Sequence, residues 1–192
     1  MANATTIQQV SYIIRSDDEL KYIIVSAPGR RQKDDIKVTD LLYRLADEII
    51  HQQKDDTFAF IKERFMAIAM GLSLSFSMSD LLDDMLFEMK EDGSLEYIVS
   101  RGEYLSAYIL ADVLGYEFID ASELIRFRSN KLDYTTTNTI SRKYLKNKSN
   151  FVIGGFYGAT IGGTIKLLTR GGSDVTGALI ARAVKAKVYE NW

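Results

Sequence analysis

The sequence predicts an α/β fold, a three-layer α/β/α sandwich with a largely parallel central sheet. Short apolar runs of β-prone residues alternate along the chain with longer segments whose apolar residues recur at helical spacing. Three glycine-containing turns, SAPG, GGFYG and RGGSD, each come directly after an expected strand. Because ligands bind at the carboxyl ends of parallel strands, we expect a site where these turns meet.

The first strand and the first helix follow one another near the start of the chain. The run Tyr22–Val25 is continuously β-prone and is closed by Pro28 and Gly29, which is typical of a buried strand ending in a turn. The next segment has apolar residues at helical spacing from Val38, which predicts a helix to about residue 50. Thr39 can cap this helix at its start.

The other elements rest on the same two periodicities. Gly115 is suited to end a helix in the left-handed conformation, and a strand follows it at once. The Thr-rich section over 128–149 has weak periodicity and predicts no definite element. The remaining expected helices cover 57–70, 80–91, 103–114 and 174–185, and the remaining strands cover 116–119, 151–159, 163–169 and 187–192.

Composition limits the functions that this chain can have. Its 192 residues are 46% hydrophobic, enough for the core of one domain. The absence of cysteine excludes thiolate chemistry and cysteine-based zinc sites. A net charge of −2 gives no general attraction for nucleic acid or anionic lipid. With no apolar run of about 18 residues and no signal-peptide pattern at its start, we expect a cytoplasmic, globular protein without membrane or nucleic-acid partners.

The segment RGGSD, residues 170–174, has the composition of an anion site. Its glycines allow backbone amides to approach a ligand, and the helix after them presents free N–H groups and a partial positive charge. Arg170 can bind an anion through two parallel hydrogen bonds. Asp174 has the opposite charge and can orient a lysine or a metal ion, or cap the helix. An ordinary turn followed by a helix cap explains the same residues.

Two further residues have both a structural and a functional interpretation. Glu103, in the segment SRGE, is expected in the first turn of a helix, where it either interacts with the helix dipole or receives a cation such as a substrate ammonium. Thr39 either caps its helix or binds a ligand carboxylate. The only histidine, His51, is expected to be solvated, so histidine catalysis is not expected.

Four segments carry a resemblance to a known family when they are taken in order. VSAPG…KVTDLLY, SRGEYLSAYILADVLGYEFIDA, VIGGFYGAT and TRGGSDVTGALIARAV resemble the aspartate kinase branch of the amino acid kinase family, from about Ala2 to Trp192. SRGE followed by RGGSD–TGA–A separates this branch from acetylglutamate, carbamate and uridylate kinases. Aspartate kinases phosphorylate the side-chain carboxylate of L-aspartate with ATP and Mg²⁺, which commits it toward lysine, threonine and methionine.

The resemblance implies roles for particular residues and no protein-only metal site. It also implies a homo-oligomeric parent enzyme. By resemblance, Glu103 binds the substrate ammonium, and Arg170 and Thr39 bind a substrate carboxylate. Ser173 and the turn at Phe156 line the same pocket, and Ser26 lies near the transferred phosphate. Gly171 and Gly172 form the phosphate turn, and Asp174 orients a catalytic lysine.

The sequence also departs from the family pattern. The family begins with a strand and a Lys-Phe-Gly-Gly-Ser turn that supplies the catalytic lysine, and MANATTIQQV resembles the helix that follows this turn. Beyond YENW the family continues with a Thr-Asp motif for the nucleotide and with regulatory ACT domains. Residues 1–192 are therefore expected to be a partial catalytic domain with little kinase activity of its own. Gly154 stands where the family often has proline, and Lys21, Lys37 and Lys166 are the candidates if another lysine substitutes.

Two alternatives remain open from the sequence. The chain can be a non-catalytic domain that binds an amino acid or a partner protein, or a sibling kinase that acts on another carboxylate or carbamate. Glu103 and Arg170 together match an α-amino acid with a free ammonium, which argues against an acetylated substrate.

Overall fold

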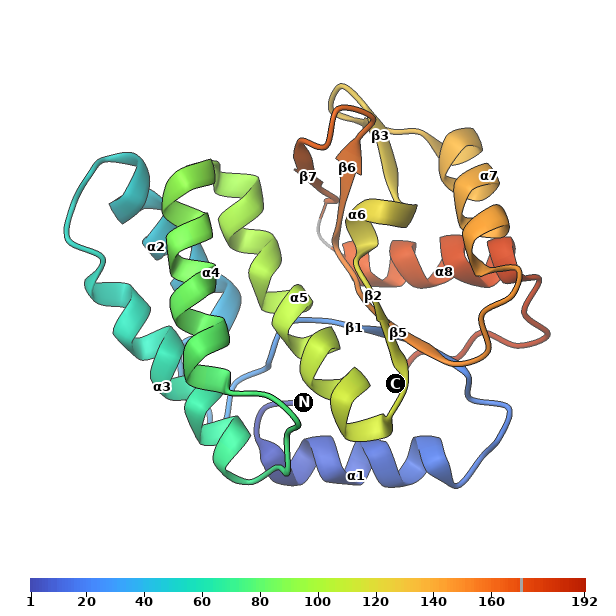
Figure 1. Cartoon of the computed structure of the whole chain (residues 1–192), viewed down its shortest axis with the longest axis horizontal. Helices are drawn as coiled ribbons and strands as arrows, with labels where there is room; N and C mark the ends of the chain where they lie inside the picture. The colour runs from blue at the N-terminus through green and yellow to red at the C-terminus, as the bar shows by residue number, and fades with distance from the viewer. Residues whose placement is uncertain (170) are drawn as a thin grey trace.

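The computed structural model describes residues 1–169 and 171–192, in which helices surround two small sheets (Figure 1). The helices are α1 (Ala4–Arg15), α2 (Val38–Ile50), α3 (Asp56–Met70), α4 (Met78–Asp92), α5 (Leu95–Leu114), α6 (Ala121–Leu124), α7 (Tyr134–Leu145) and α8 (Gly172–Val184). The strands are β1 (Tyr22–Val25), β2 (Glu117–Ile119), β3 (Arg126–Arg128), β4 (Lys131–Leu132), β5 (Phe151–Gly154), β6 (Tyr157–Thr160) and β7 (Ile165–Leu167).

The first sheet is parallel, in the order β1-β5-β2, with Ile153 of β5 paired with Ile24 on one side and Ile119 on the other. All four residues of β5 are buried. Their side chains alternate between two hydrophobic clusters, since Val152 packs with the helical cluster around α5 while Phe151 and Ile153 pack with the cluster that contains residues of α6 and α8. The α/β class and the parallel sheet covered on both faces are thus confirmed.

The second sheet is mixed, in the order β4-β3-β6-β7. Strands β3 and β6 are parallel, whereas the β3–β4 and β6–β7 pairs are antiparallel. The single strand expected over 151–159 is therefore two strands that belong to different sheets, and the chain leaves the first sheet at Gly155 and Phe156.

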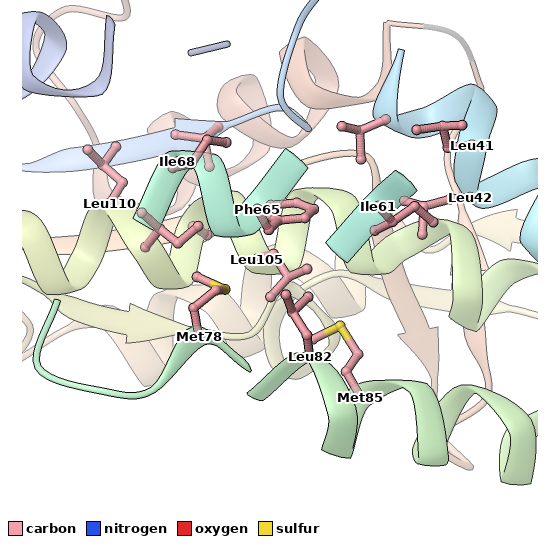
Figure 2. Packing of buried hydrophobic residues seen from close by; sticks show 14 of the residues in the cluster. Leu41, Leu42, Ile61, Phe65, Ile68, Met78, Leu82, Met85, Leu105 and Leu110 are labelled. Carbon is pink, nitrogen blue, oxygen red and sulfur yellow. The ribbon is translucent and has the colours of Figure 1, made fainter. Parts of the chain in front are cut away.

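The larger core lies between α2, α3, α4 and α5, on one face of the parallel sheet. Figure 2 shows side chains from these helices meeting around Phe65, which is fully buried. Helix α5 passes between this cluster and the strands, and it contacts both α2 and β5. Its middle therefore lies at the boundary between the helical layer and the sheet.

Helix α5 begins at Leu95, eight residues before the expected start, and Ser94 caps it by accepting a hydrogen bond from the Tyr97 amide. The prediction that Glu103 opens a helix was wrong, because SRGE lies in the middle of α5. The helix is buried on most of its faces, so its apolar residues do not form the one-sided pattern that marks a surface helix.

Two other expectations need correction. The Thr-rich section over 128–149 contains the short strand β4 and then helix α7, whose start is fixed by Asp133 because its side chain accepts a hydrogen bond from the Thr136 amide. The strand expected over 187–192 is absent from the structure, where this segment is irregular. Its polar groups bond instead to α8, as when the Tyr189 hydroxyl donates to the Asp174 carbonyl oxygen at 3.2 Å. Without a neighbouring strand to pair with, β-prone residues do not form a ladder.

Candidate functional site

The exits of β1 and β5 and the start of α8 converge at one edge of the parallel sheet. The Gly155 amide donates to the Val25 carbonyl oxygen at 2.8 Å, which joins the two exits. Gly155 also lies against α8, because a Cβ added to it would be 2.7 Å from the Cα of Ser173. A side chain at residue 155 would separate these elements, so glycine is required for this approach.

The middle of α5 closes the same edge from the helical layer. A Cβ added to Gly102 would lie 2.9 Å from both the Cβ of Ala27 and the Cδ1 of Leu42, and one added to Gly154 would lie 2.9 Å from the Glu103 carbonyl oxygen. The glycine of SRGE therefore lets α5 approach the turn after β1. As a result, Glu103 is placed directly beside the exits of both strands.

Glu103 is a buried acid, and one carboxylate oxygen, Oε2, has no hydrogen-bond partner among the described residues. No ion pair to Glu103 forms in residues 1–169 or 171–192. Burial raises the pKa of this carboxyl group from 4.5 to about 7, although a hydrogen bond from the Ala27 amide opposes the change. A buried acid that lacks a partner is suited to receive a cationic group.

Phe156 forms the turn between the two sheets in a left-handed conformation, with φ +74°. Such a conformation in a bulky residue costs about 1–3 kcal/mol. Two hydrogen bonds hold it, since the Phe156 amide donates to Thr176 Oγ1 at 3.2 Å and its carbonyl oxygen accepts from the Leu168 amide at 2.7 Å. Its half-buried side chain lies against the first residue of α8, as a Cβ on Gly172 would be 3.0 Å from Phe156 Cδ2.

The start of α8 carries the remaining residues of the glycine turn. Gly171 is left-handed, with φ +80°, and its carbonyl oxygen accepts a hydrogen bond from the Asp174 amide. Ser173 is half-buried, and Asp174 is exposed. Asn191 donates to Asp174 Oδ1 at 3.1 Å. Sequence reasoning missed this partner, because residues 187–192 were expected to lie in a strand. Arg170 lies outside the described residues.

Two more of the expected residues lie at this edge. Ser26 is exposed immediately after β1, and Thr39 is half-buried in the first turn of α2. Val38 precedes Thr39 and packs toward Gly102. A Cβ added to Gly102 would lie 3.8 Å from the Cγ1 of Val38. The close approaches of Gly102 to Ala27, of Gly154 to Glu103 and of Gly155 to Ser173 therefore form the candidate site at the carboxyl ends of β1 and β5. The other expected residues are near these contacts along the chain: Ser26, Phe156, Gly171, Gly172 and Asp174 lie within two residues of them, and Thr39 follows Val38.

The three candidate lysines lie in different places. Lys166 on β7 is bonded to Glu96 at 3.0 Å, near the start of α5. Lys21 precedes β1 and so lies at the opposite end of that strand from the site. Lys37 directly precedes α2, two residues before Thr39, which makes it the candidate closest to the site along the chain.

Among residues 1–169 and 171–192, no group of three or more His, Asp or Glu side chains is arranged to hold a metal ion. In this part of the chain, no helix combines the length and apolarity needed to cross a bilayer.

Relatives of known identity agree with this architecture. Residues 1–192 match the Amino acid kinase family. Aspartokinase 3 of Bacillus subtilis is 28% identical over all of this chain and 46% of its own length, and the aspartokinase of Chlamydia muridarum is 28% identical over 97% of this chain and 44% of its own. The crystal structure of Clostridium acetobutylicum aspartate kinase superposes with a TM-score of 0.94 at 39% identity, over 100% of this chain and 44% of that one.

A more distant structure, E. coli aspartokinase III in complex with aspartate and ADP, superposes with a TM-score of 0.81 at 21% identity, which supports the fold. The chain spans less than half the length of the relatives that it matches. With a family match over its whole length, the site at the ends of β1 and β5 and a shared fold, the chain belongs to the amino acid kinase family.

Proposed function

We propose that this chain is part of the catalytic domain of an aspartate kinase, which transfers the terminal phosphoryl group of ATP to the side-chain carboxylate of L-aspartate. The observation that carries the proposal is Glu103, a buried and unpaired acid where the exits of β1 and β5 meet α5. An α-ammonium group would satisfy its free oxygen. The similarity to Clostridium acetobutylicum aspartate kinase supports the same substrate class.

Substrate binding would couple to the ionisation of Glu103. At neutral pH the free protein holds a mixture of protonated and ionised Glu103, because its pKa is about 7. A docked ammonium favours the carboxylate and would therefore lower this pKa. Thr39 and Arg170 would bind a substrate carboxylate, while Ser26, Phe156 and Ser173 would line the pocket.

Phosphoryl transfer requires positioning and charge neutralisation more than acid–base chemistry. The amides of Gly171 and Gly172 and the first turn of α8 would face the phosphates, where the helix N-terminus favours negative charge. Asp174 would orient a lysine that neutralises the developing charge. ATP as phosphoryl donor agrees with the ADP bound to E. coli aspartokinase III, and Mg²⁺ would neutralise charge on the nucleotide phosphates.

The pathway and setting follow from the same assignment. The product, 4-phospho-L-aspartate, leads toward lysine, threonine and methionine, and we place the parent enzyme in the cytoplasm as a homo-oligomer. Because the chain spans 46% or less of its aspartokinase relatives, we expect it to bind aspartate but to have little kinase activity alone.

The test is isothermal titration of the chain with L-aspartate at pH 7.5, beside N-acetyl-L-aspartate, which lacks the ammonium. Aspartate should bind and the acetylated compound should not. Glu103→Gln should weaken aspartate binding at least 10-fold. A matched control is Glu63→Gln, an exposed glutamate of α3 that pairs with Arg31, which should bind as the unsubstituted chain does. A folded chain that binds no aspartate would contradict the proposal.

A further inference from the structure

The connection from β1 to α2, residues 26–37, has no helix or strand of its own, although it carries part of the site. It begins with Ser26 and Ala27 and leads directly into the helix that holds Thr39. Most of its residues are exposed, so hydrophobic packing alone does not fix its path.

One guanidinium group from α3 holds this connection at two points. Arg64 Nη2 donates to the Gly29 carbonyl oxygen at 2.7 Å, and Nη1 donates to the Ile36 carbonyl oxygen at 3.1 Å. Nη1 also pairs with Asp35 Oδ2 at 2.5 Å. Arg31, within the connection, binds the same carboxylate from the exposed side through Nε at 3.1 Å.

Both anchored carbonyl groups are close in sequence to the site. Gly29 is two residues after Ala27, whose amide donates to the Glu103 carboxylate and whose Cβ packs against Gly102. Ile36 is three residues before Thr39. Displacement at either anchor would therefore move a group that contacts Glu103 or a group that lines the pocket.

The chemistry of Arg64 fits such a role better than a contribution to packing. Its side chain is only 2% exposed, so its charge has been removed from water, and Nε has no partner among the described residues. An apolar side chain of similar length could fill this volume without that desolvation cost. Only a planar guanidinium holds three oxygens in a fixed geometry, which the ammonium of lysine does not do.

We propose that Arg64 is a positioning residue that fixes the β1–α2 connection and, through it, the aspartate pocket. The second part rests on the proposed function, whereas the first does not. Within the described part of the chain, Arg64 makes no hydrogen bond to a residue assigned to the substrate. It acts through Gly29, Asp35 and Ile36.

Arg64→Lys tests the proposal, because it keeps the positive charge but removes the planar guanidinium that binds both carbonyl oxygens. Amide hydrogen exchange followed by mass spectrometry should show exchange over residues 29–36 at least 10-fold faster, with exchange in β5 unchanged. Titration with L-aspartate should show about 10-fold weaker binding. Arg31→Gln is the matched control, since it removes the other arginine on Asp35 but leaves both anchored carbonyl groups bonded, and it should change affinity less than 2-fold.

The outcomes separate the role of Arg64 in fixing the connection from its effect on the aspartate pocket. If a folded Arg64→Lys variant exchanges over 29–36 as slowly as the unsubstituted chain, the proposal is wrong. Fast exchange with unchanged aspartate affinity would refute the link to the pocket. If the unsubstituted chain binds no aspartate, the proposed function fails, yet exchange still decides whether Arg64 fixes the connection. Should Arg64→Lys not fold, Asp35→Asn removes the charge that pairs with both Arg64 and Arg31, and it should accelerate exchange near residues 31–36 several-fold more than Arg31→Gln does; no acceleration beyond that of Arg31→Gln would overturn the proposal.

Discussion

Replacing Glu103 by glutamine should make the ligand-free chain more stable at alkaline pH. The substitution preserves the size of the side chain and its ability to accept the hydrogen bond from the Ala27 amide, but it removes the ionisable proton. Because the side chain is 5% exposed, solvent screening barely reduces the effect of burial. Any change in stability with pH that the substitution abolishes can be attributed to this carboxyl group.

The magnitude follows from the difference between the folded and unfolded pKa values of Glu103, about 7 and 4.5. At 1.36 kcal/mol per pKa unit, ionised Glu103 destabilises the fold by about 3 kcal/mol. Below pH 4.5 the group is protonated in both states and costs nothing. Between pH 4.5 and 7 the unfolded chain releases the proton while the folded chain retains it, so stability falls as the pH rises, and above pH 7 the full cost is present.

Urea unfolding at pH 5 and at pH 8.5, followed by far-UV circular dichroism, measures this difference. We expect Glu103→Gln to exceed the unsubstituted chain by about 3 kcal/mol at pH 8.5 and by less than 1 kcal/mol at pH 5. Saturating L-aspartate at pH 8.5 should stabilise the unsubstituted chain and not the variant. A stability difference that is the same at both pH values would refute the reasoning, since it would show that the carboxyl group ionises without a burial cost.

Three further substitutions test the packing of the fold, each by urea unfolding at pH 7. Gly155→Ala places a methyl group 2.7 Å from the Cα of Ser173 and should destabilise the fold by about 1–3 kcal/mol, whereas a neutral result would mean that α8 shifts freely. Tyr157→Phe removes a buried hydroxyl that donates to Asp120 at 3.0 Å and should cost about 1.5 kcal/mol; equal stability would show that the bond contributes nothing. Phe65→Ala, in the centre of the helical core, should cost about 3–5 kcal/mol, and a loss below 1 kcal/mol would contradict the packing in Figure 2.

Local sequence signals predicted the elements whose pattern is one-sided. Helix α2 was predicted with its observed bounds, because one face of Val38–Ile50 is apolar and the other is polar. β1 was predicted because its four residues are uniformly β-prone and a proline and a glycine follow after Ser26 and Ala27. In both segments, intrinsic preference and tertiary environment agree.

The errors come from features that depend on distant parts of the chain. The predicted start of helix α5 was eight residues too late, because burial of this helix between the helical layer and the sheet removes the amphipathic pattern. The strand expected over 187–192 depends on a neighbour that this segment does not have within the described structure, where it bonds to α8 instead. Helix α7 was missed because threonine has low helix propensity, which the Asp133 cap and its packing against α8 overcome.

The candidate site shows the same division. Sequence reasoning named Glu103 and identified the turns that form the edge, yet it assigned Glu103 to the first turn of a helix and not to the buried middle of α5. Its burial depends on Gly102, which brings α5 against Ala27 and Leu42, and no local pattern reports such a contact. Arg64 was missed for a similar reason, since its partners lie 28 to 35 residues earlier in the chain.

The left-handed turn at Phe156 couples the candidate site to the docking of α8. Its amide is bonded to Thr176, twenty residues later, and its carbonyl oxygen to Leu168, so neither bond can form before α8 and the end of β7 have docked. Release of α8 from the sheet would break the bond to Thr176 and free the left-handed turn at the edge that we propose binds aspartate. A ligand bound at this edge would therefore oppose such local opening, because it binds the closed native state and not the opened one.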